Sequence, residues 1–148
     1  MTFFDPKLEC MSRNELKIHQ DTALASMFQK LKGRNQFYSK KIWGAGLFFD
    51  DLMTYEDLKQ VPFTNKMELM EAQDQSPPFG TNLTFPEKNY TRFHQTSGTT
   101  GTPLRVLDTE ESWQWWGHCW GFVLAGAGLT SQDRLFVPFS FGPFIGFW

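Results

Sequence analysis

The sequence predicts an α/β fold in which an N-terminal helical region is followed by the first strands and helix of a larger, truncated α/β domain. In the first half of the chain, apolar residues recur at helical spacing behind capping residues. Two strand-like segments then flank a loop of Gly, Ser and Thr, and a long helical segment follows them. Residues 75–80 are rich in turn formers, so we place the helical region at residues 1–80 and the incomplete α/β domain at residues 81–148.

The first long helix is predicted by the residues at its two ends. Ser12 is the candidate N-cap, and Glu15 stands three residues later, which is the spacing of a capping box. Gly33 is the candidate stop, so we expect a helix near residues 13–32. The apolar residues at helical spacing within it are Leu16, Ala23, Leu24, Met27, Phe28 and Leu31.

Shorter helices are predicted in the rest of the helical region. One covers residues 36–43 and is stopped by the Gly-Ala-Gly sequence at residues 44–46. Thr54 is the candidate cap of a short helical turn, and Thr64 is the candidate cap of a further helix. Because charged residues of both signs are interspersed here, we expect this half of the chain to be solvated.

The second half begins with two predicted strands, at residues 91–95 and 104–107. Thr109 is the candidate cap of a long helix, because acidic residues follow it in the first turn. This helix is expected to run to about Ala127, where two glycines mark its end. Residues 135–137 are predicted to form a buried strand.

Charge is unevenly distributed along the second half. From residue 113 to residue 148 the only charged residues are Asp133 and Arg134, so we expect this part to be deeply buried. The last residues are rich in Phe, Gly and Pro, and soluble proteins rarely leave such an apolar patch exposed. We interpret the chain as truncated; the alternative is a terminal strand that packs into the chain's own core.

Composition excludes several classes of protein. The 148 residues are 41% hydrophobic and 20% charged, which fits about one folded domain and argues against a disordered chain. A net charge of −2 gives no basic footprint, so we expect no nucleic-acid partner. We also expect no signal peptide and no membrane span. The two cysteines, Cys10 and Cys119, are too few for a disulfide scaffold and fit a reducing, cytoplasmic location.

The loop between the two predicted strands is the candidate binding site. Its residues are Thr96, Ser97, Gly98, Thr99, Thr100, Gly101, Thr102 and Pro103. Gly98 and Gly101 can adopt positive φ angles, which lets successive backbone N–H groups converge on an anion. The hydroxyls add donors that can hold a polyphosphate, and Pro103 restricts the exit of the loop. Composition alone favours a flexible hairpin loop, whereas the order of the residues does not.

The loop sequence TSGTTGTP resembles the phosphate-binding motif of the adenylate-forming superfamily, the acyl-CoA synthetase-like enzymes. Every fixed position of that motif is matched, and Thr102 stands at a variable position that is often Lys. It is not a Walker A loop, because no Gly-Lys-Ser/Thr follows at the required spacing. Other stretches resemble the phenylacetate–CoA ligase branch of the superfamily: residues 12–16, 37–41, 55–58, 61–66, 79–80 and 139–146.

The resemblance implies a two-step ligase reaction. A carboxylate attacks the α-phosphate of ATP to give acyl-AMP and pyrophosphate, and the CoA thiol then attacks the acyl-adenylate. Mg²⁺ is expected to neutralise the phosphates. The loop would hold the β- and γ-phosphates, with Ser97, Thr99 and Thr100 as hydroxyl donors and Gly98 and Gly101 as amide donors.

The resemblance also assigns an acid pocket. Phe139, Phe141, Gly142 and Phe144 belong to an aromatic-glycine segment that helps to line this pocket in the family, so we expect an aryl, phenylacetate-like acid. The adenine- and ribose-binding residues and the catalytic lysine are expected beyond Trp148. The fragment alone is therefore expected to be inactive, and a homodimer is left open.

Two other functions stay open at this point. The parent protein activates a different acid or hands the acyl group to a carrier protein, or the chain is a non-catalytic interaction module.

His94 lies two residues before the loop, where a strand histidine is more often structural than functional. His118 and Cys119 are neighbours on a helix with no further ligand pair, so we expect no metal site.

Overall fold

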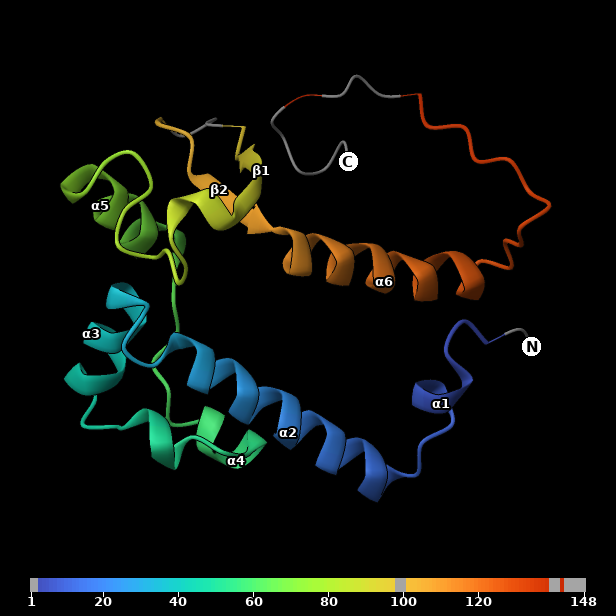
Figure 1. The fold of residues 1–148 in the computed structure, drawn as a ribbon, viewed down its shortest axis with the longest axis horizontal. Coiled ribbons are helices and arrows are strands. Elements are labelled where there is room, and N and C mark those ends of the chain that lie inside the picture. Colours follow the sequence, from blue (N-terminus) through green and yellow to red (C-terminus); the bar gives the residue numbers. More distant parts are fainter. Residues whose placement is uncertain (1–2, 98–100, 139–141, 143–148) are drawn as a thin grey trace.

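The computed structural model describes residues 3–97, 101–138 and 142. The two longest helices, α2 and α6, run in opposite directions; α3 and α4 lie beside α2, whereas α5 lies beside a two-stranded sheet (Figure 1). The elements are α1 (Pro6–Glu9), α2 (Arg13–Leu31), α3 (Gln36–Gly44), the 3-10 helix η1 (Phe49–Asp51), α4 (Tyr55–Leu58), α5 (Lys66–Gln75), the 3-10 helix η2 (Glu87–Asn89), β1 (Tyr90–Gln95), β2 (Arg105–Thr109) and α6 (Glu110–Gly126).

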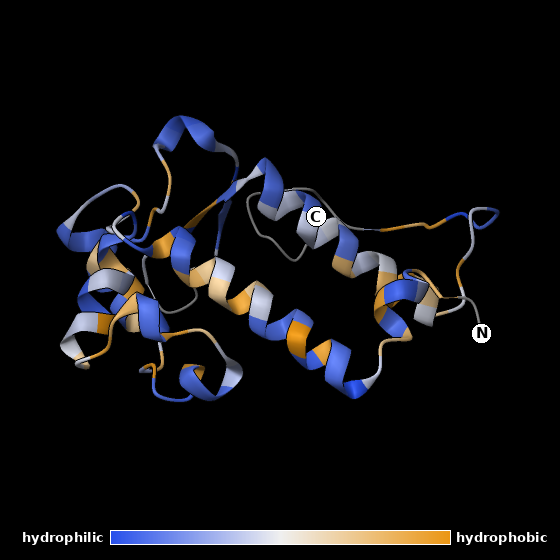
Figure 2. Cartoon of the chain, turned by 60° about the horizontal axis from the view of Figure 1, so that its bottom comes forward, coloured by the Kyte–Doolittle hydropathy of each residue, from blue (hydrophilic) through white to orange (hydrophobic). Residues whose placement is uncertain are grey.

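The start of α2 is fixed by a capping box. The Glu15 amide donates to Ser12 Oγ at 3.3 Å, and the Ser12 amide donates to the Glu15 carboxylate at 2.8 Å. Two backbone donors that lack a partner within the helix are thereby satisfied. The helix predicted near residues 13–32 is confirmed. Apolar and polar residues are interspersed along it (Figure 2), and Phe28 is the one residue of this helix that is buried.

Two shorter helices also begin with capping boxes. Thr54 caps α4 as predicted, with Asp57 as its partner. The pKa of Asp57 is lowered, chiefly because the Thr54 hydroxyl donates a hydrogen bond to its carboxylate. The predicted cap of α5 was wrong: Asn65 occupies this position instead of Thr64. Glu68 stands three residues after Asn65 and completes the box, which a cap one residue earlier would not allow.

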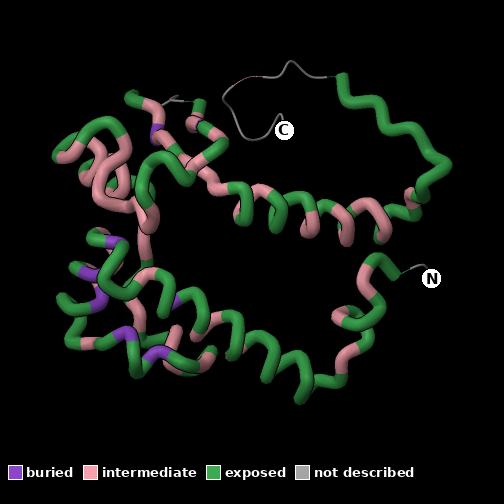
Figure 3. Tube along the Cα trace, viewed as in Figure 1, coloured by how far each residue is buried: buried purple, intermediate pink, exposed green. Residues whose placement is uncertain are grey.

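The hydrophobic core lies within the helical region. Phe28, Ile42, Phe49 and Leu52 are each at most 3% exposed and pack together from α2, α3, η1 and the residue after η1. Figure 3 shows most of the buried residues gathered around α3 and the adjoining end of α2. Partly buried residues surround this cluster: Leu24, Leu31, Tyr38, Leu47, Leu58 and Val61.

The two predicted strands pair as an antiparallel hairpin. His94 faces Val106 and Gln95 faces Arg105 in the register. The Thr109 side chain accepts a hydrogen bond from the Ser112 amide at 3.1 Å, so the predicted cap of α6 is confirmed. Because the helix starts directly after β2, its first turns pack against the hairpin.

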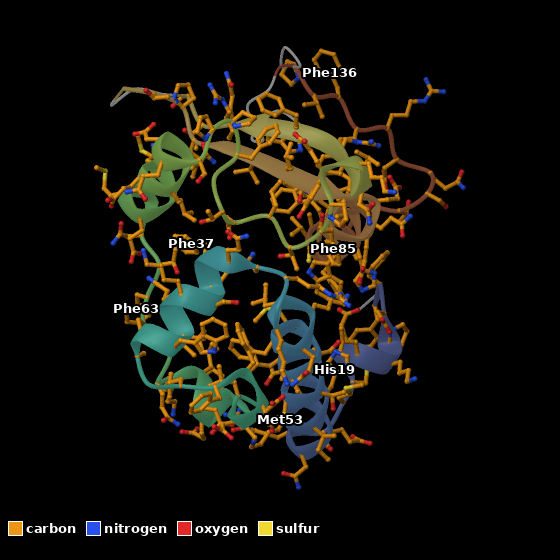
Figure 4. The ribbon with its side chains drawn as sticks, turned by 60° about the vertical axis from the view of Figure 1, so that its left-hand side comes forward. His19, Phe37, Met53, Phe63, Phe85 and Phe136 are labelled. Atoms are coloured by element: carbon orange, nitrogen blue, oxygen red, sulfur yellow. The ribbon has the colours of Figure 1, made fainter. Side chains whose placement is uncertain are left out.

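The expected deep burial of the second half was wrong. In α6, Trp115, Trp120 and Val123 are 60%, 44% and 56% exposed. Residues 135–137 form no strand, and Phe136 is 85% exposed at the outer edge of the molecule (Figure 4). The physical reason is the absence of a covering layer: in the part of the chain that the structure describes, the sheet has two strands and neither pairs with this segment.

Two sets of contacts connect α6 to the N-terminal part of the chain. Near its start, Glu111 forms an ion pair with Lys30 of α2. Near its end, the Phe4 ring packs at 5.2 Å from the rings of both His118 and Phe122. Of the helices described, none is long and apolar enough to cross a membrane.

Candidate functional site

The candidate loop is closed at its base by two hydrogen bonds. The Thr96 amide donates to the Leu104 carbonyl oxygen at 3.0 Å, and the Leu104 amide donates to Thr96 Oγ1 at 3.0 Å. Leu104 is buried, so this closure is shielded from water on one side. Thr96 and Leu104 therefore form the last bonded pair of the hairpin before the loop. The Thr96 hydroxyl acts as an acceptor in this closure, so one of the predicted donors also has a structural role.

The described loop residues face solvent. Ser97, Gly101 and Thr102 are exposed, and Pro103 is half-buried. Gly101 has a φ of 131°, a value that non-glycine residues rarely adopt, so its predicted positive φ is confirmed. An added Cβ there would meet no atom of the described residues within 4 Å, so backbone conformation rather than space favours glycine at this position. The remaining predicted phosphate ligands, Gly98, Thr99 and Thr100, lie outside the described residues.

The strand that leaves the loop is held by α5. The Gln73 side chain donates from Nε2 to the Arg105 carbonyl oxygen at 2.6 Å and accepts from the Arg105 amide at Oε1 at 3.1 Å. Sequence reasoning did not identify Gln73, because it lies far from the loop in the chain and no local motif marks it. Only the tertiary structure brings it to β2.

Beneath the loop base lies a pocket of about 350 Å³ between the hairpin and α6. His94 is 2% exposed, stacks on Trp113 at 5.3 Å, and places Nε2 at 3.6 Å from Asp108 Oδ2. Ser112 donates to the other oxygen of Asp108 at 3.0 Å. Thr96 also lines this pocket, so the pocket reaches the base of the loop.

A larger pocket of about 560 Å³ lies between α3 and α5, where Figure 4 shows Phe37. Lys41 lines it and donates to Glu68 at 2.7 Å and to the Phe63 carbonyl oxygen at 2.6 Å. The Lys41 hydrogen bond is the main reason that the pKa of Glu68 is lowered. The Lys41–Glu68 pair is therefore already satisfied within the fold.

The predicted acid-binding residues lie mostly outside the part of the chain that the structure describes. Gly142 is described, whereas Phe139, Phe141 and Phe144 lie outside the described residues. His118 packs among aromatic rings rather than with other potential metal ligands. Within residues 3–97 and 101–138, no group of three His, Cys, Asp or Glu side chains is arranged to hold a metal ion.

Comparison with known proteins identifies relatives along almost the whole chain. No protein-family model matches it. It is 30% identical over 145 residues to phenylacetate–coenzyme A ligase of Escherichia coli (strain K12), which covers 98% of this chain and 32% of the relative. It is 29% identical over 143 residues to the ligase of the same name from Thermus thermophilus, with coverages of 97% and 31%. The chain therefore spans about a third of the length of these relatives.

Solved structures match the fold as well. A 2-hydroxyisobutyryl-CoA ligase in complex with 2-HIB-AMP and CoA gives a TM-score of 0.79 at 29% identity, over 86% of this chain and 27% of that chain. The same ligase in the postadenylation state with R3-HIB-AMP gives a TM-score of 0.79 at 25% identity. The fold and the loop sequence of this chain are similar to those of the class of adenylate-forming acid–CoA ligases. Its sequence relatives within the class are the phenylacetate–CoA ligases.

Proposed function

We propose that the chain is the N-terminal part of an ATP-dependent acid–CoA ligase, and that residues 96–103 bind the phosphates of ATP. The observation that carries the proposal is the loop sequence at the tip of a hairpin in a fold matched by ligases crystallised with acyl-AMP. The closed loop base and the positive φ of Gly101 support it, because both favour a preorganised turn of backbone N–H groups.

The loop residues would act by hydrogen bonding alone. Ser97, Thr99 and Thr100 donate from their hydroxyls to phosphate oxygens, while Gly98 and Gly101 donate from their backbone amides. Thr102 and Pro103 then shape the exit of the loop. Hydrogen bonds to a charged group contribute about 1.5–3 kcal/mol each, so a few of them suffice to hold the triphosphate without a lysine.

The chemistry proposed for the parent protein is adenylation followed by transfer to CoA. A carboxylate oxygen attacks the α-phosphorus, the bond to the β-phosphate oxygen breaks, and pyrophosphate leaves as acyl-AMP forms. The CoA sulfur then attacks the acyl carbon, and AMP leaves. The loop contributes by stabilising the negative charge that develops on the departing pyrophosphate.

Mg²⁺ binding is not built into the described part of the chain. The loop offers hydroxyls and amides but no carboxylate, and no suitable cluster of ligands exists among the described residues. Because Mg²⁺ is commonly held by one or two carboxylates together with substrate phosphates, we assign no step of the reaction to a metal held by these residues.

An aryl acid is the first candidate substrate, since the sequence relatives are phenylacetate–CoA ligases. The acid pocket would include Phe139, Phe141, Gly142 and Phe144. A different acid is the second candidate, because the matched structures belong to a ligase named for 2-hydroxyisobutyrate. A carrier protein in place of CoA is the corresponding alternative for the acceptor.

The exposed aromatic face of α6 supports a larger parent protein. Trp115, Trp116 and Trp120 are each at least 40% exposed, and an aromatic surface of this kind is usually covered. An apolar dye should therefore bind strongly to residues 1–148 and weakly to the protein from the complete reading frame. Equal, weak binding to both would instead favour a self-contained interaction module.

The test of the function is ATP–pyrophosphate exchange by the protein from the complete reading frame, with phenylacetate and 2-hydroxyisobutyrate as acids. Exchange with one of them is expected, and Thr99→Ala should reduce it. Thr91→Ala is the matched control, because Thr91 is an exposed threonine on β1 outside the loop. Absence of exchange with a broad panel of acids would refute the ligase proposal, and unchanged exchange in Thr99→Ala would argue against its role in the loop.

A further inference from the structure

Gln73 makes a contact with β2 that a neighbouring strand would ordinarily make. In a sheet, a strand residue whose N–H and C=O point outward exchanges two hydrogen bonds with the next strand. At Arg105 both of these groups bond instead to the side-chain amide of Gln73, at 2.6 Å and 3.1 Å. The side chain thus satisfies the outer edge of β2 at its first residue, and it ties α5 directly to the hairpin.

Two further contacts strengthen this attachment. The Arg105 guanidinium donates from Nη1 to the Pro78 carbonyl oxygen at 3.1 Å. Gly80 lies so close to α5 that an added Cβ would approach the Ala72 carbonyl carbon and the Gln73 nitrogen to 3.0 Å. The turn after α5 is therefore packed against the helix, and Arg105 is held by three hydrogen bonds to α5 and this turn.

The attachment point lies next to the base of the loop. Arg105 directly follows Leu104, and Leu104 exchanges two hydrogen bonds with Thr96. A shift of the Arg105 backbone would therefore move both residues that close the loop. Because preorganised donors lose their advantage when they are displaced by a fraction of an ångström, the position of this residue bears on the loop's binding strength.

We infer that Gln73 is a positioning residue for the phosphate-binding loop: it holds the exit strand so that the loop donors converge on the triphosphate. The inference rests on the proposed function of the loop and adds a residue outside the family motif. Gln73 acts through Arg105 and does not itself contact the nucleotide.

The experiment compares Gln73→Met with wild type in the protein from the complete reading frame. Methionine keeps the length of the side chain but offers neither hydrogen bond. We expect the KM for ATP to rise about fivefold to tenfold, as the weakening of one or two hydrogen bonds from the displaced loop to the triphosphate would produce, with little change in the KM for the acid. Amide hydrogen exchange of Arg105 should accelerate in the same variant.

Gln75→Met is the matched control, because Gln75 is an exposed residue of the same helix that bonds to Glu71 and not to the hairpin. Its KM for ATP should equal that of wild type. If Gln73→Met melts near the temperature of wild type, a raised KM for ATP reflects a displaced loop rather than global unfolding of the variant. A KM for ATP unchanged in Gln73→Met, or a fall in stability with both KM values unaltered, would overturn the inference. If wild type itself bound no ATP by calorimetry, the proposed function would fail instead.

Discussion

Asn35 offers a quantitative test of how the helical region is joined to the hairpin. Its side chain is only 1% exposed and serves two purposes. The oxygen accepts from the Tyr38 amide at 2.9 Å and caps α3. The nitrogen donates to the Asn82 carbonyl oxygen at 2.7 Å and to Thr84 Oγ1 at 3.0 Å. We predict that Asn35→Ala destabilises the chain more than removal of a cap alone.

The magnitude follows from adding these contributions. Loss of an N-cap residue costs about 1 kcal/mol. Each of the two long-range hydrogen bonds contributes roughly 0.5–1.5 kcal/mol, and the half-buried Asn82 carbonyl would lose this donor. The sum predicts a loss of about 2–4 kcal/mol in the free energy of unfolding, or about 6–12 °C in melting temperature for a chain of this size.

The assay is thermal unfolding followed by circular dichroism, with Asn65→Ala as the matched control. Asn65 is also an N-cap asparagine, but it is exposed, and its side-chain oxygen accepts only from the Glu68 amide of its own helix among the described contacts. Asn65→Ala should therefore cost about 1 kcal/mol. Equal losses in the two variants would refute the reasoning, because they would show that the bonds to Asn82 and Thr84 contribute nothing.

The other predictions concern three glycine positions and a helix cap. Gly121→Ala should release the Phe4 ring from α6, because a methyl group there would overlap that ring; the NMR signals of the ring report this change. Gly117→Ala should stabilise α6 by about 1 kcal/mol, because its site is open, and the melting temperature measures this gain. Gly80→Ala should lower the unfolding free energy by about 2 kcal/mol or more, since φ is +75° and backbone atoms lie at 3.0 Å; urea titration measures this loss. The pKa of Asp57 is lowered in the folded chain, so its ionised carboxylate stabilises the fold above the ordinary pKa of about 4. This stabilisation is lost as the pH falls through the lowered pKa of the folded state. The difference in melting temperature between wild type and Asp57→Asn should therefore shrink in acid.

Elements that depend on local chemistry could be predicted from the sequence. The cap at Ser12 and the cap at Thr54 each bond to residues three positions away, so their signals are contained within four residues. The error at Thr64 has the same origin, since two adjacent residues can both cap a helix. The Glu68 partner decides for Asn65, and that spacing was present in the sequence.

Features that depend on distant partners could not be predicted in the same way. Residues 135–137 have strand-like composition, but a strand also needs an edge to pair with, and composition does not supply one. The role of Gln73 depends on a residue 32 positions later in the chain. For the loop, the sequence predicted the positive φ of Gly101, but not that the Thr96 hydroxyl would close the loop base.

The orientation of the hairpin relative to the helical region depends on two separate attachments. At one end, Asn35 holds the segment at residues 81–85, whose Thr84 and Phe85 amides donate to the Tyr90 hydroxyl at the start of β1. At the other end, Gln73 holds Arg105 beside the loop. Two attachments on different strands restrict the direction of the hairpin more than either attachment would alone. The helices before residue 80 therefore help to position both strands that flank the loop, although none of their residues belongs to the loop motif.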